Sequence, residues 1–379
     1  MKVVSGGVTK ARGFKANGIW CGIKRKKPDL ALIYSTCPAA AAGVFTKNSV
    51  VAAPLTVTKS HLKNGKARAI VCNSGNANCF TGKFGLMYAH QTAQLFAELL
   101  QVDIKDVLIS STGIIGKALP FHKIEDGAEK LVKGLSTEGA HKCARAILTT
   151  DLDTKEIAVT TTVGGKRITI GGCAKGAGMV APNMATMLGF ITTDVSIQPR
   201  LLKTALKEAT EESFNCITVD GCMSTNDMVV VLANGCAGNK TIRSKGKDYQ
   251  NFLKALKYVC LELAKKIVLD AEGSSKFIQI EVSGAKTKSQ AKAVGLAVGN
   301  SMLVKTAAFG SNPNWGRVAQ AVGALGIKGI HEETLKISFS PFDRKEITIR
   351  VDLSLGKDNC TVFSSDLSYE YIKINGEYN

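Results

Sequence analysis

A glycine-rich segment that leads into a threonine near the middle of the chain is the first place where this sequence could do chemistry. Four glycines stand from Gly171 to Gly178, and glycine lets the backbone adopt positive φ angles and approach a ligand closely. Pro182 then fixes one φ angle, and the apolar run over 187–193 predicts a buried strand. Thr186 therefore stands where a constrained loop enters a sheet, a position that suits a nucleophile.

Two other interpretations of this segment stay open from the residues alone: a plain turn before a strand, and a phosphate-binding loop. The dinucleotide fingerprint does not fit, because Gly176-Ala177-Gly178 lacks a third glycine at the required spacing. The P-loop pattern is also absent, and Lys117 follows its glycines at the wrong spacing for that motif. Composition alone favours the turn.

An internal threonine is a weak nucleophile because its hydroxyl keeps its proton. A threonine at a chain terminus, in contrast, carries a free α-amine, with a reference pKa of about 7.7–8.0. The unprotonated amine can accept the hydroxyl proton, so no histidine is needed. Lys175 could lower the proton affinity of that amine by charge repulsion, or it could hold a substrate carboxylate.

The bulk composition indicates a globular cytoplasmic protein. The 379 residues are 45% hydrophobic and 21% charged, and the length allows one large core or two domains. We expect no membrane helix and no signal peptide, because the chain has neither an uninterrupted apolar run of about 20 residues nor a typical leader. The eleven cysteines form no Cys-x-x-Cys pair, which predicts reduced thiols. The scattered histidines and cysteines predict no structural metal.

The formal net charge of +18 raises the possibility of a nucleic-acid-binding protein without catalysis. The lysines are spread along the chain, however, and the densest cluster is the short run 24–27. Only 6% of the residues are aromatic, which leaves few platforms for base stacking. A solvated basic surface that attracts anionic small-molecule substrates is the favoured explanation, with neither nucleic acid nor membrane as a partner.

Helical and strand patterns alternate on both sides of position 186 and predict an α/β fold whose layers are shared by the two halves. We expect strands at 17–36 (two, around the basic turn), 67–72, 107–111, on both sides of Gly164-Gly165, at 187–193, 217–221 and 228–234, and in the last part of the chain. We expect helices at 86–100, 122–134, 137–148, 199–213 and 252–267.

The segment from Lys175 to Leu188, with the sequence KGAGMVAPNMATML, resembles the central motif of the ornithine acetyltransferase (glutamate N-acetyltransferase) family of arginine biosynthesis. Further similar segments lie at 29–45 and 309–317, so the resemblance spans essentially the whole chain. It implies that the precursor cleaves itself between Ala185 and Thr186. The products would be an α chain of residues 1–185 and a β chain of residues 186–379, which begins with the nucleophile Thr186.

The resemblance also implies a fold and an assembly. The fold would be a layered α/β structure of the ornithine acetyltransferase and DmpA-like type, built jointly from both parts of the cleaved precursor as one catalytic unit. Two α and two β chains would associate into a heterotetramer. Two departures from the family pattern, at Cys222-Met223 and at Asn312, leave any role of these positions open.

Further site residues follow from the resemblance. Thr112 and Gly113, at the end of an expected strand, would form the oxyanion hole, although an ordinary strand-ending turn explains this pair about equally well without the family. The residues that would contact the substrate are Thr150, Lys175, Thr186, Glu272 and Asn375. Plain alternatives are a helix-end threonine at position 150 and a solvated surface carboxylate at Glu272.

The reaction that the resemblance implies is a ping-pong acetyl transfer. Thr186 would take the acetyl group from N2-acetylornithine and pass it to glutamate, with no bound cofactor and with acetyl-CoA as a possible second donor. An alternative of another class is an N-terminal-nucleophile aminopeptidase of related fold. Such enzymes typically use serine, whereas this chain has threonine with transferase-like flanking residues.

Overall fold

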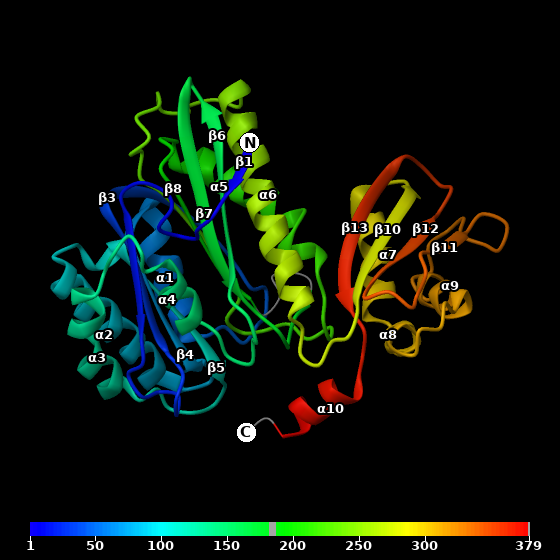
Figure 1. Cartoon of the computed structure of the whole chain (residues 1–379), viewed down its shortest axis with the longest axis horizontal. Coiled ribbons are helices and arrows are strands. Elements are labelled where there is room, and N and C mark those ends of the chain that lie inside the picture. The colour runs from blue at the N-terminus through cyan, green and yellow to red at the C-terminus, as the bar shows by residue number, and fades with distance from the viewer. Residues whose placement is uncertain (182–186, 378–379) are drawn as a thin grey trace. The chain divides into compact units, whose positions relative to one another are not determined.

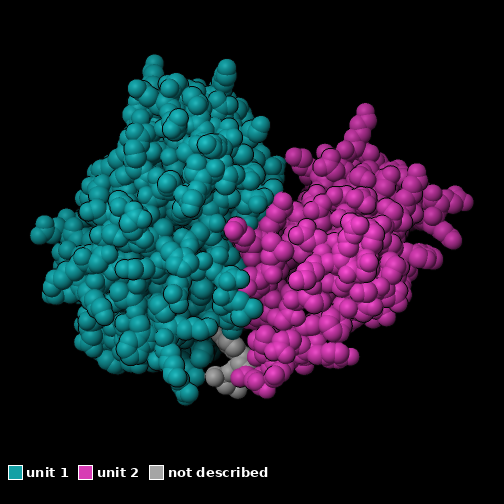
Figure 2. Space-filling view, in the orientation of Figure 1, with its two compact units in different colours: residues 1–176, 186–213, 224–263 teal, residues 177–185, 214–223, 264–379 magenta. Residues whose placement is uncertain are grey.

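The computed structural model describes residues 1–181 and 187–377 of the chain. The chain folds into two compact units, which Figure 2 distinguishes by colour. The first unit comprises residues 1–176, 186–213 and 224–263, and the second comprises residues 177–185, 214–223 and 264–379.

The first unit is built on a nine-stranded mixed sheet of described residues, with the order β1-β6-β7-β8-β9-β3-β4-β5 and with β2 paired to β3 (Figure 1). Its strands are β1 (Lys2–Val4), β2 (Phe14–Ile19), β3 (Leu30–Phe45), β4 (Lys66–Asn76), β5 (Val107–Ile114), β6 (Lys155–Val163), β7 (Lys166–Lys175), β8 (Leu188–Thr193) and β9 (Met228–Ala233). The pairs β4/β5 and β8/β9 are parallel, and the other pairs are antiparallel.

The middle of this sheet joins strands from both sides of position 186. β8 lies between β7 and β9, and β9 lies against β3. Every residue of β8 and of β9 is buried, which is typical of central strands that are covered on both faces. The residue that follows Thr186 therefore leads directly into the interior of the sheet.

Helices cover both faces of the sheet, and the alternation of side chains in β3 shows this. Leu30 and Leu32 pack in a core with α2 (Gly82–Leu100) and α3 (Phe121–Lys133), whereas Ala31 and Ile33 pack in a second core with α4 (Ala140–Ala146). Because successive side chains of a strand point to opposite faces, the two cores lie on opposite sides of the sheet. The remaining helices of this unit are α1 (Ala53–His61), α5 (Pro199–Glu211) and most of α6 (Lys247–Leu269).

The second unit contains a four-stranded sheet of order β11-β12-β10-β13, in which only β10 and β12 are parallel. Its strands are β10 (Phe277–Ala285), β11 (Lys336–Phe339), β12 (Glu346–Asp352) and β13 (Asp358–Ser365), and its helices are α7 (Lys288–Asn300), α8 (Met302–Phe309), α9 (Trp315–Gly323) and α10 (Tyr369–Gly376). α7 packs on β10 and β13, and this contact is close because Gly295 lies directly against Val362.

Most of the expected elements are confirmed, including the hairpin around Gly164-Gly165, and two predictions are wrong. Residues 217–221 do not form a strand, because Asp220 and Gly221 turn the chain and Gly221 has a φ of +73°. The last part of the chain ends in the helix α10 instead of a strand. The Ser368 hydroxyl accepts a hydrogen bond from the Tyr371 amide and caps this helix, a local contact that its strand-like composition does not reveal.

Three further properties bear on function. No helix in the described part of the chain is both long and apolar enough to cross a membrane. Among residues 1–181 and 187–377, no group of three or more His, Cys, Asp or Glu side chains is placed to hold a metal ion. The described cysteines form no disulfide; six are buried, four are half-buried and Cys222 is exposed.

Candidate active site

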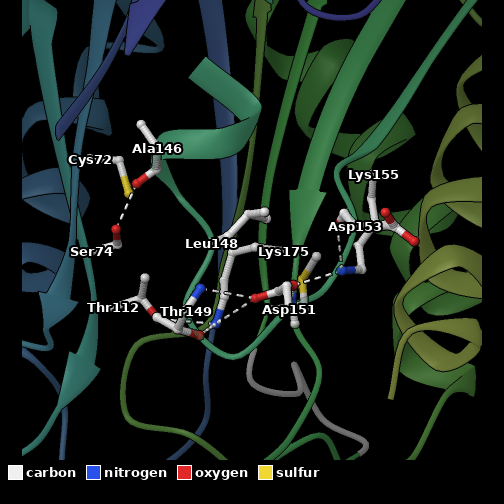
Figure 3. A network of polar contacts seen from close by, with 12 residues as sticks. Cys72, Ser74, Thr112, Ala146, Leu148, Thr149, Asp151, Asp153, Lys155 and Lys175 are labelled. Atoms are coloured by element: carbon white, nitrogen blue, oxygen red, sulfur yellow. Dashed lines mark hydrogen bonds and ion pairs between the residues drawn. The ribbon is translucent and has the colours of Figure 1, made fainter. Parts of the chain in front are cut away.

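A buried lysine at the end of β7 is the centre of a polar network in the first unit. The Lys175 Nζ donates hydrogen bonds to the hydroxyls of Thr149 at 2.7 Å and Thr112 at 3.3 Å (Figure 3). It also lies 3.9 Å from the Asp151 carboxylate. Because Lys175 is only 3% exposed, these oxygen atoms take the place of water around its charge.

The contact with Lys175 determines whether the Thr112 hydroxyl donates or accepts in this hydrogen bond. An ammonium group can only donate, so the Thr112 oxygen must accept this bond. The hydroxyl proton of Thr112 is then left for another acceptor, and the adjacent charge strengthens it as a donor. The geometry thus creates a hydrogen-bond donor at the end of β5.

Gly113, the next residue of β5, occupies a position that only glycine can fill. Its φ is +132°, and a Cβ there would lie 2.4 Å from the Gly75 carbonyl carbon and 2.5 Å from the Asn76 nitrogen of β4. Both obstacles are backbone atoms of the neighbouring strand, so no side-chain rotation could make room. The sequence-predicted pair Thr112-Gly113 is therefore held on a closely packed strand end.

Asp151, which the sequence analysis missed, joins the parts of this network. Its Oδ1 accepts hydrogen bonds from the Lys155 Nζ and the Gly176 amide, both at 2.7 Å, and its Oδ2 accepts one from the Thr149 amide at 3.0 Å. Burial acts to raise the pKa of Asp151, but the charges of Lys175 and Lys155 together with these hydrogen bonds outweigh burial, and the pKa lies below its usual range. The carboxylate thus stays ionised and fixes the start of the glycine-rich segment.

We expect Asp151→Asn to destabilise the first unit by about 3–5 kcal/mol, because it removes a buried negative charge that pairs with Lys155 and lies beside Lys175. Urea unfolding at pH 7 measures this change. The matched control is Asp126→Asn on the exposed surface of α3, which should shift the free energy of unfolding by no more than about 0.5 kcal/mol. Equal effects of the two substitutions would contradict the assigned role of Asp151.

The same pair of variants should respond differently to pH. A carboxyl whose pKa is lowered by folding stabilises the protein fully above its unfolded value of about 3.9, and this contribution disappears as the pH falls toward the folded value. The stability gap between the wild type and Asp151→Asn should therefore be constant from pH 5 to 7 and should narrow below about pH 4. Urea titrations across this range check the expectation.

Thr150 is predicted to contact the substrate, and this stays a prediction; the threonine of the same loop that contacts Lys175 is its neighbour Thr149. Thr150 itself is half-buried. The one sequence feature that could have indicated the buried network is the pair Asp151 and Lys155, which have opposite charges and are four residues apart. These two side chains form an ion pair at 2.7 Å. That spacing usually indicates a helix surface, whereas here it closes a buried loop.

Ala185 and Thr186, the predicted cleavage pair, lie outside the described residues, and the next residue, Met187, is described. Its amide donates a hydrogen bond to the Asp227 Oδ1 at 3.0 Å. Asp227 is 1% exposed, and burial raises its pKa well above the usual range despite the Met187 hydrogen bond and the charge of Lys175. Burial therefore favours the neutral form of Asp227, and its Oδ2 has no hydrogen-bond partner among the described residues.

The neighbouring Asn226 connects this point to β5. Its side-chain nitrogen donates to the carbonyl oxygens of Ala77 at 2.7 Å and Ser111 at 2.8 Å. The adjacent residues Asn226 and Asp227 thus bind the carbonyl oxygen of Ser111, directly before Thr112, and the amide of Met187, directly after Thr186. These contacts leave no local pattern in the sequence, because Asn226 lies more than 100 positions from both of its partners.

Two predicted substrate-contacting residues come together in the second unit. The Asn375 side-chain nitrogen donates a hydrogen bond to the Glu272 Oε2 at 2.9 Å. The Glu272 amide donates to the Ala177 carbonyl at 3.0 Å, and a Cβ at position 178 would lie 2.2 Å from the Glu272 carboxylate. Gly178 therefore lets the carboxylate lie directly on the glycine-rich segment, which explains one glycine of the motif.

Asp220, also missed from the sequence, fixes the same segment from another side. Its carboxylate accepts hydrogen bonds from the amides of Met179 at 2.6 Å and Val180 at 2.9 Å, and from the Tyr371 hydroxyl at 3.1 Å. Burial and the nearby Asp220 charge raise the pKa of Tyr371, so this hydroxyl remains a donor. Asp220 thus links the glycine-rich segment to α10, which carries Asn375.

The first unit also contains a cavity of about 580 Å³ bordered by β3, α1 and α5. Three lysines lie in its wall, Lys59, Lys63 and Lys203, and none of the sequence-predicted site residues does. The predicted catalytic chemistry therefore does not coincide with this cavity.

Comparison with known proteins identifies the family. The model of the ArgJ family matches residues 15–345 and 340–379. The arginine biosynthesis bifunctional protein ArgJ of Caldanaerobacter subterraneus subsp. tengcongensis is 44% identical over 100% of both chains, and that of Gloeobacter violaceus is 45% identical over 99% of this chain and 98% of its own. A solved structure of ornithine acetyltransferase complexed with ornithine, from Mycobacterium tuberculosis, is 41% identical over 46% of this chain and 94% of its own, with a TM-score of 0.44.

The family model and the two bifunctional relatives cover nearly the whole chain and confirm the resemblance that its central motif indicated. The chain belongs to the ArgJ family.

Proposed function

We propose that this protein transfers an acetyl group from N2-acetylornithine to glutamate and so produces ornithine and N-acetylglutamate. The observation that carries this proposal is the full-length similarity, at 43–45% identity, to arginine biosynthesis bifunctional proteins. The word bifunctional in their names supports a second reaction here, the acetylation of glutamate by acetyl-CoA. Acetyl-CoA is then a co-substrate, and no bound cofactor is required.

The first step that we propose is cleavage of the peptide bond between Ala185 and Thr186. It divides the chain into residues 1–185 and 186–379 and gives Thr186 a free α-amine. Both products contribute strands to the sheet of the first unit, so they remain together through the core. We further propose that two copies of each product associate, and that the protein works in the cytoplasm, where a chain without disulfides among its described cysteines meets reducing conditions.

Acetyl transfer then proceeds in two half-reactions. The α-amine of Thr186 takes the hydroxyl proton as the oxygen attacks the acetyl carbonyl of N2-acetylornithine. The tetrahedral intermediate collapses, the protonated α-amine returns its proton to the departing nitrogen, and ornithine leaves an acetyl ester on Thr186. The amine of glutamate attacks this ester in the second half-reaction and regenerates the threonine hydroxyl.

Thr112 and Gly113 stabilise the negative oxygen of each tetrahedral intermediate. The support for Thr112 is its buried contact with Lys175, which leaves its hydroxyl proton to be donated. The support for Gly113 is its positive φ on a closely packed strand end, which keeps the backbone there rigid. A rigid donor that is already in place can lower the barrier by about 3–4 kcal/mol.

The remaining predicted residues bind substrate. Glu272 supplies a carboxylate for the amine of ornithine, and Asn375 orients that carboxylate through the observed hydrogen bond. Lys175 is part of the network around Asp151, and Thr150 is the residue directly before Asp151. We propose that both contact the substrate. The bonds of Lys175 to two threonine hydroxyls support a role in orienting Thr112 in addition to any contact with a substrate carboxylate.

The test compares donors and acceptors with the purified protein. We expect N-acetylglutamate to form from glutamate with either N-acetylornithine or acetyl-CoA as donor, and we expect ornithine release without glutamate to stop after one equivalent per Thr186. Liquid chromatography with mass detection follows both products. Continuous release of acetate or amino acids without an acceptor would instead favour an aminopeptidase or amidohydrolase.

A further inference from the structure

Two half-buried cysteines that the proposed chemistry does not use lie side by side in the first unit. The Sγ atoms of Cys37 in β3 and Cys236, three residues after the end of β9, are 3.3 Å apart. A disulfide requires about 2.05 Å between the sulfur atoms, so the two must approach by roughly 1.2 Å. Both residues are partly accessible to solvent, which lets a small oxidant reach them.

The β3/β9 ladder ends close to this pair. β3 and β9 are antiparallel and their last paired residues are Ala40 and Ala233, so each cysteine lies three residues beyond the ladder. Gly235 has a φ of +75°, and Cys236 therefore follows a turn at the end of β9. Only the remaining gap between the two sulfur atoms must close to form the bond.

The side chain of Asn234 holds the two strand ends in this position. Its nitrogen donates to the Arg12 carbonyl at 2.9 Å, and its oxygen accepts from the Cys236 amide at 3.1 Å. The Cys37 thiol donates to the Asn234 carbonyl at 3.7 Å. Burial, the neighbouring Cys37 and Asp194 raise the pKa of Cys236 to about 11, so little of this thiol is ionised at neutral pH and its oxidation is slow there.

We propose that Cys37 and Cys236 are a modification site: a low-molecular-weight disulfide oxidises them to an intramolecular disulfide. The thiolate of one cysteine attacks the small disulfide, forms a mixed disulfide and releases one thiol. The second cysteine, after losing its proton, attacks the protein sulfur, forms the Cys37–Cys236 bond and releases the second thiol. The protein loses two electrons and two protons, and the small disulfide is reduced to two thiols.

If the chain is cleaved before Thr186, as proposed above, this disulfide connects the two cleavage products. Cys37 belongs to residues 1–185 and Cys236 to residues 186–379, so the disulfide joins the two products covalently. A second close pair, Cys216 and Cys360 with Sγ atoms 3.8 Å apart, lies entirely within residues 186–379. Oxidation at that second pair cannot join the products.

The experiment treats the purified protein with glutathione disulfide at pH 8.5, blocks the remaining thiols with N-ethylmaleimide, and compares denaturing gels with and without dithiothreitol. A Cys222→Ala background removes the exposed thiol that could join separate molecules. We expect one band of the combined mass without dithiothreitol and two bands with it. Cys37→Ala and Cys236→Ala should each abolish the combined band, and the matched control Cys216→Ala should retain it.

Failure of this proposal can be distinguished from failure of the proposed cleavage. If the chain is not cleaved, the reduced lane shows a single full-length band, and a tryptic digest then decides. A disulfide-linked peptide pair containing Cys37 and Cys236 supports the site, and alkylated Cys37 and Cys236 after oxidation overturn it. In the cleaved protein, two separate bands without dithiothreitol, or a combined band that survives Cys37→Ala, would overturn it as well.

Discussion

Thr186→Ala should give an uncleaved chain of 379 residues whose acetyltransferase activity is lower by a factor of about 10⁴ or more. Alanine removes the hydroxyl that attacks in both cleavage and transfer, and without cleavage the α-amine that accepts the proton does not form. Intact-mass measurement and a glutamate acetylation assay follow the two effects separately.

The matched control for this variant is Thr186→Ser. Serine keeps both the hydroxyl and, after cleavage, the α-amine, so this variant should still cleave and should retain measurable transfer. An uncleaved Thr186→Ala protein that transfers acetyl groups at the wild-type rate would remove the nucleophile from the mechanism.

Gly113→Ala should lower kcat by at least about 10²-fold and should also lower the stability of the protein. The new methyl group would meet the backbone of β4 at 2.4–2.5 Å, so the ends of β4 and β5 must separate. Overpacking of this kind costs about 1–3 kcal/mol, and the positive φ of +132° adds about 1–2 kcal/mol for a residue with a side chain. Steady-state kinetics and urea unfolding measure the two effects.

Gly116→Ala is the matched control, because Gly116 also has a positive φ, +82°, but no heavy atom lies within 4 Å of its added Cβ. It should lose stability through strain and keep most of its activity.

Thr112→Val tests the proposed oxyanion hole without changing the backbone, and it should lower kcat by about 10²–10³-fold while Thr112→Ser does not. Unchanged kcat in Thr112→Val would exclude Thr112 as a donor in the transition state.

The sequence predicted those features of the fold that depend on local periodicity. The strand before Thr112, the amphipathic helix α6 and the hairpin at Gly164-Gly165 each have a pattern within a short window. The α10 helix was predicted wrongly because its residues are rich in β-branched and aromatic types. The Ser368 cap and the hydrogen bond from the Tyr371 hydroxyl to Asp220 stabilise the helix instead.

In the candidate site, only those residues that lie in segments similar to the family could be predicted from the sequence. Thr112, Lys175 and Glu272 came from similarity to a family, and the structure gives each of them specific partners. Asp151 and Asp227 could not be predicted, because their importance comes from burial and from partners that are distant in sequence. Asp151, for example, acquires its role only when β7 brings Lys175 and Gly176 to it.

The most direct test of the whole account is the intact mass of the purified, active protein under denaturing and reducing conditions. We predict two polypeptides whose masses add up to that of the full chain plus one water molecule, with the second beginning at Thr186. A fully active protein in which residues 185 and 186 are still joined would contradict the central claim, because Thr186 would then have no α-amine of its own.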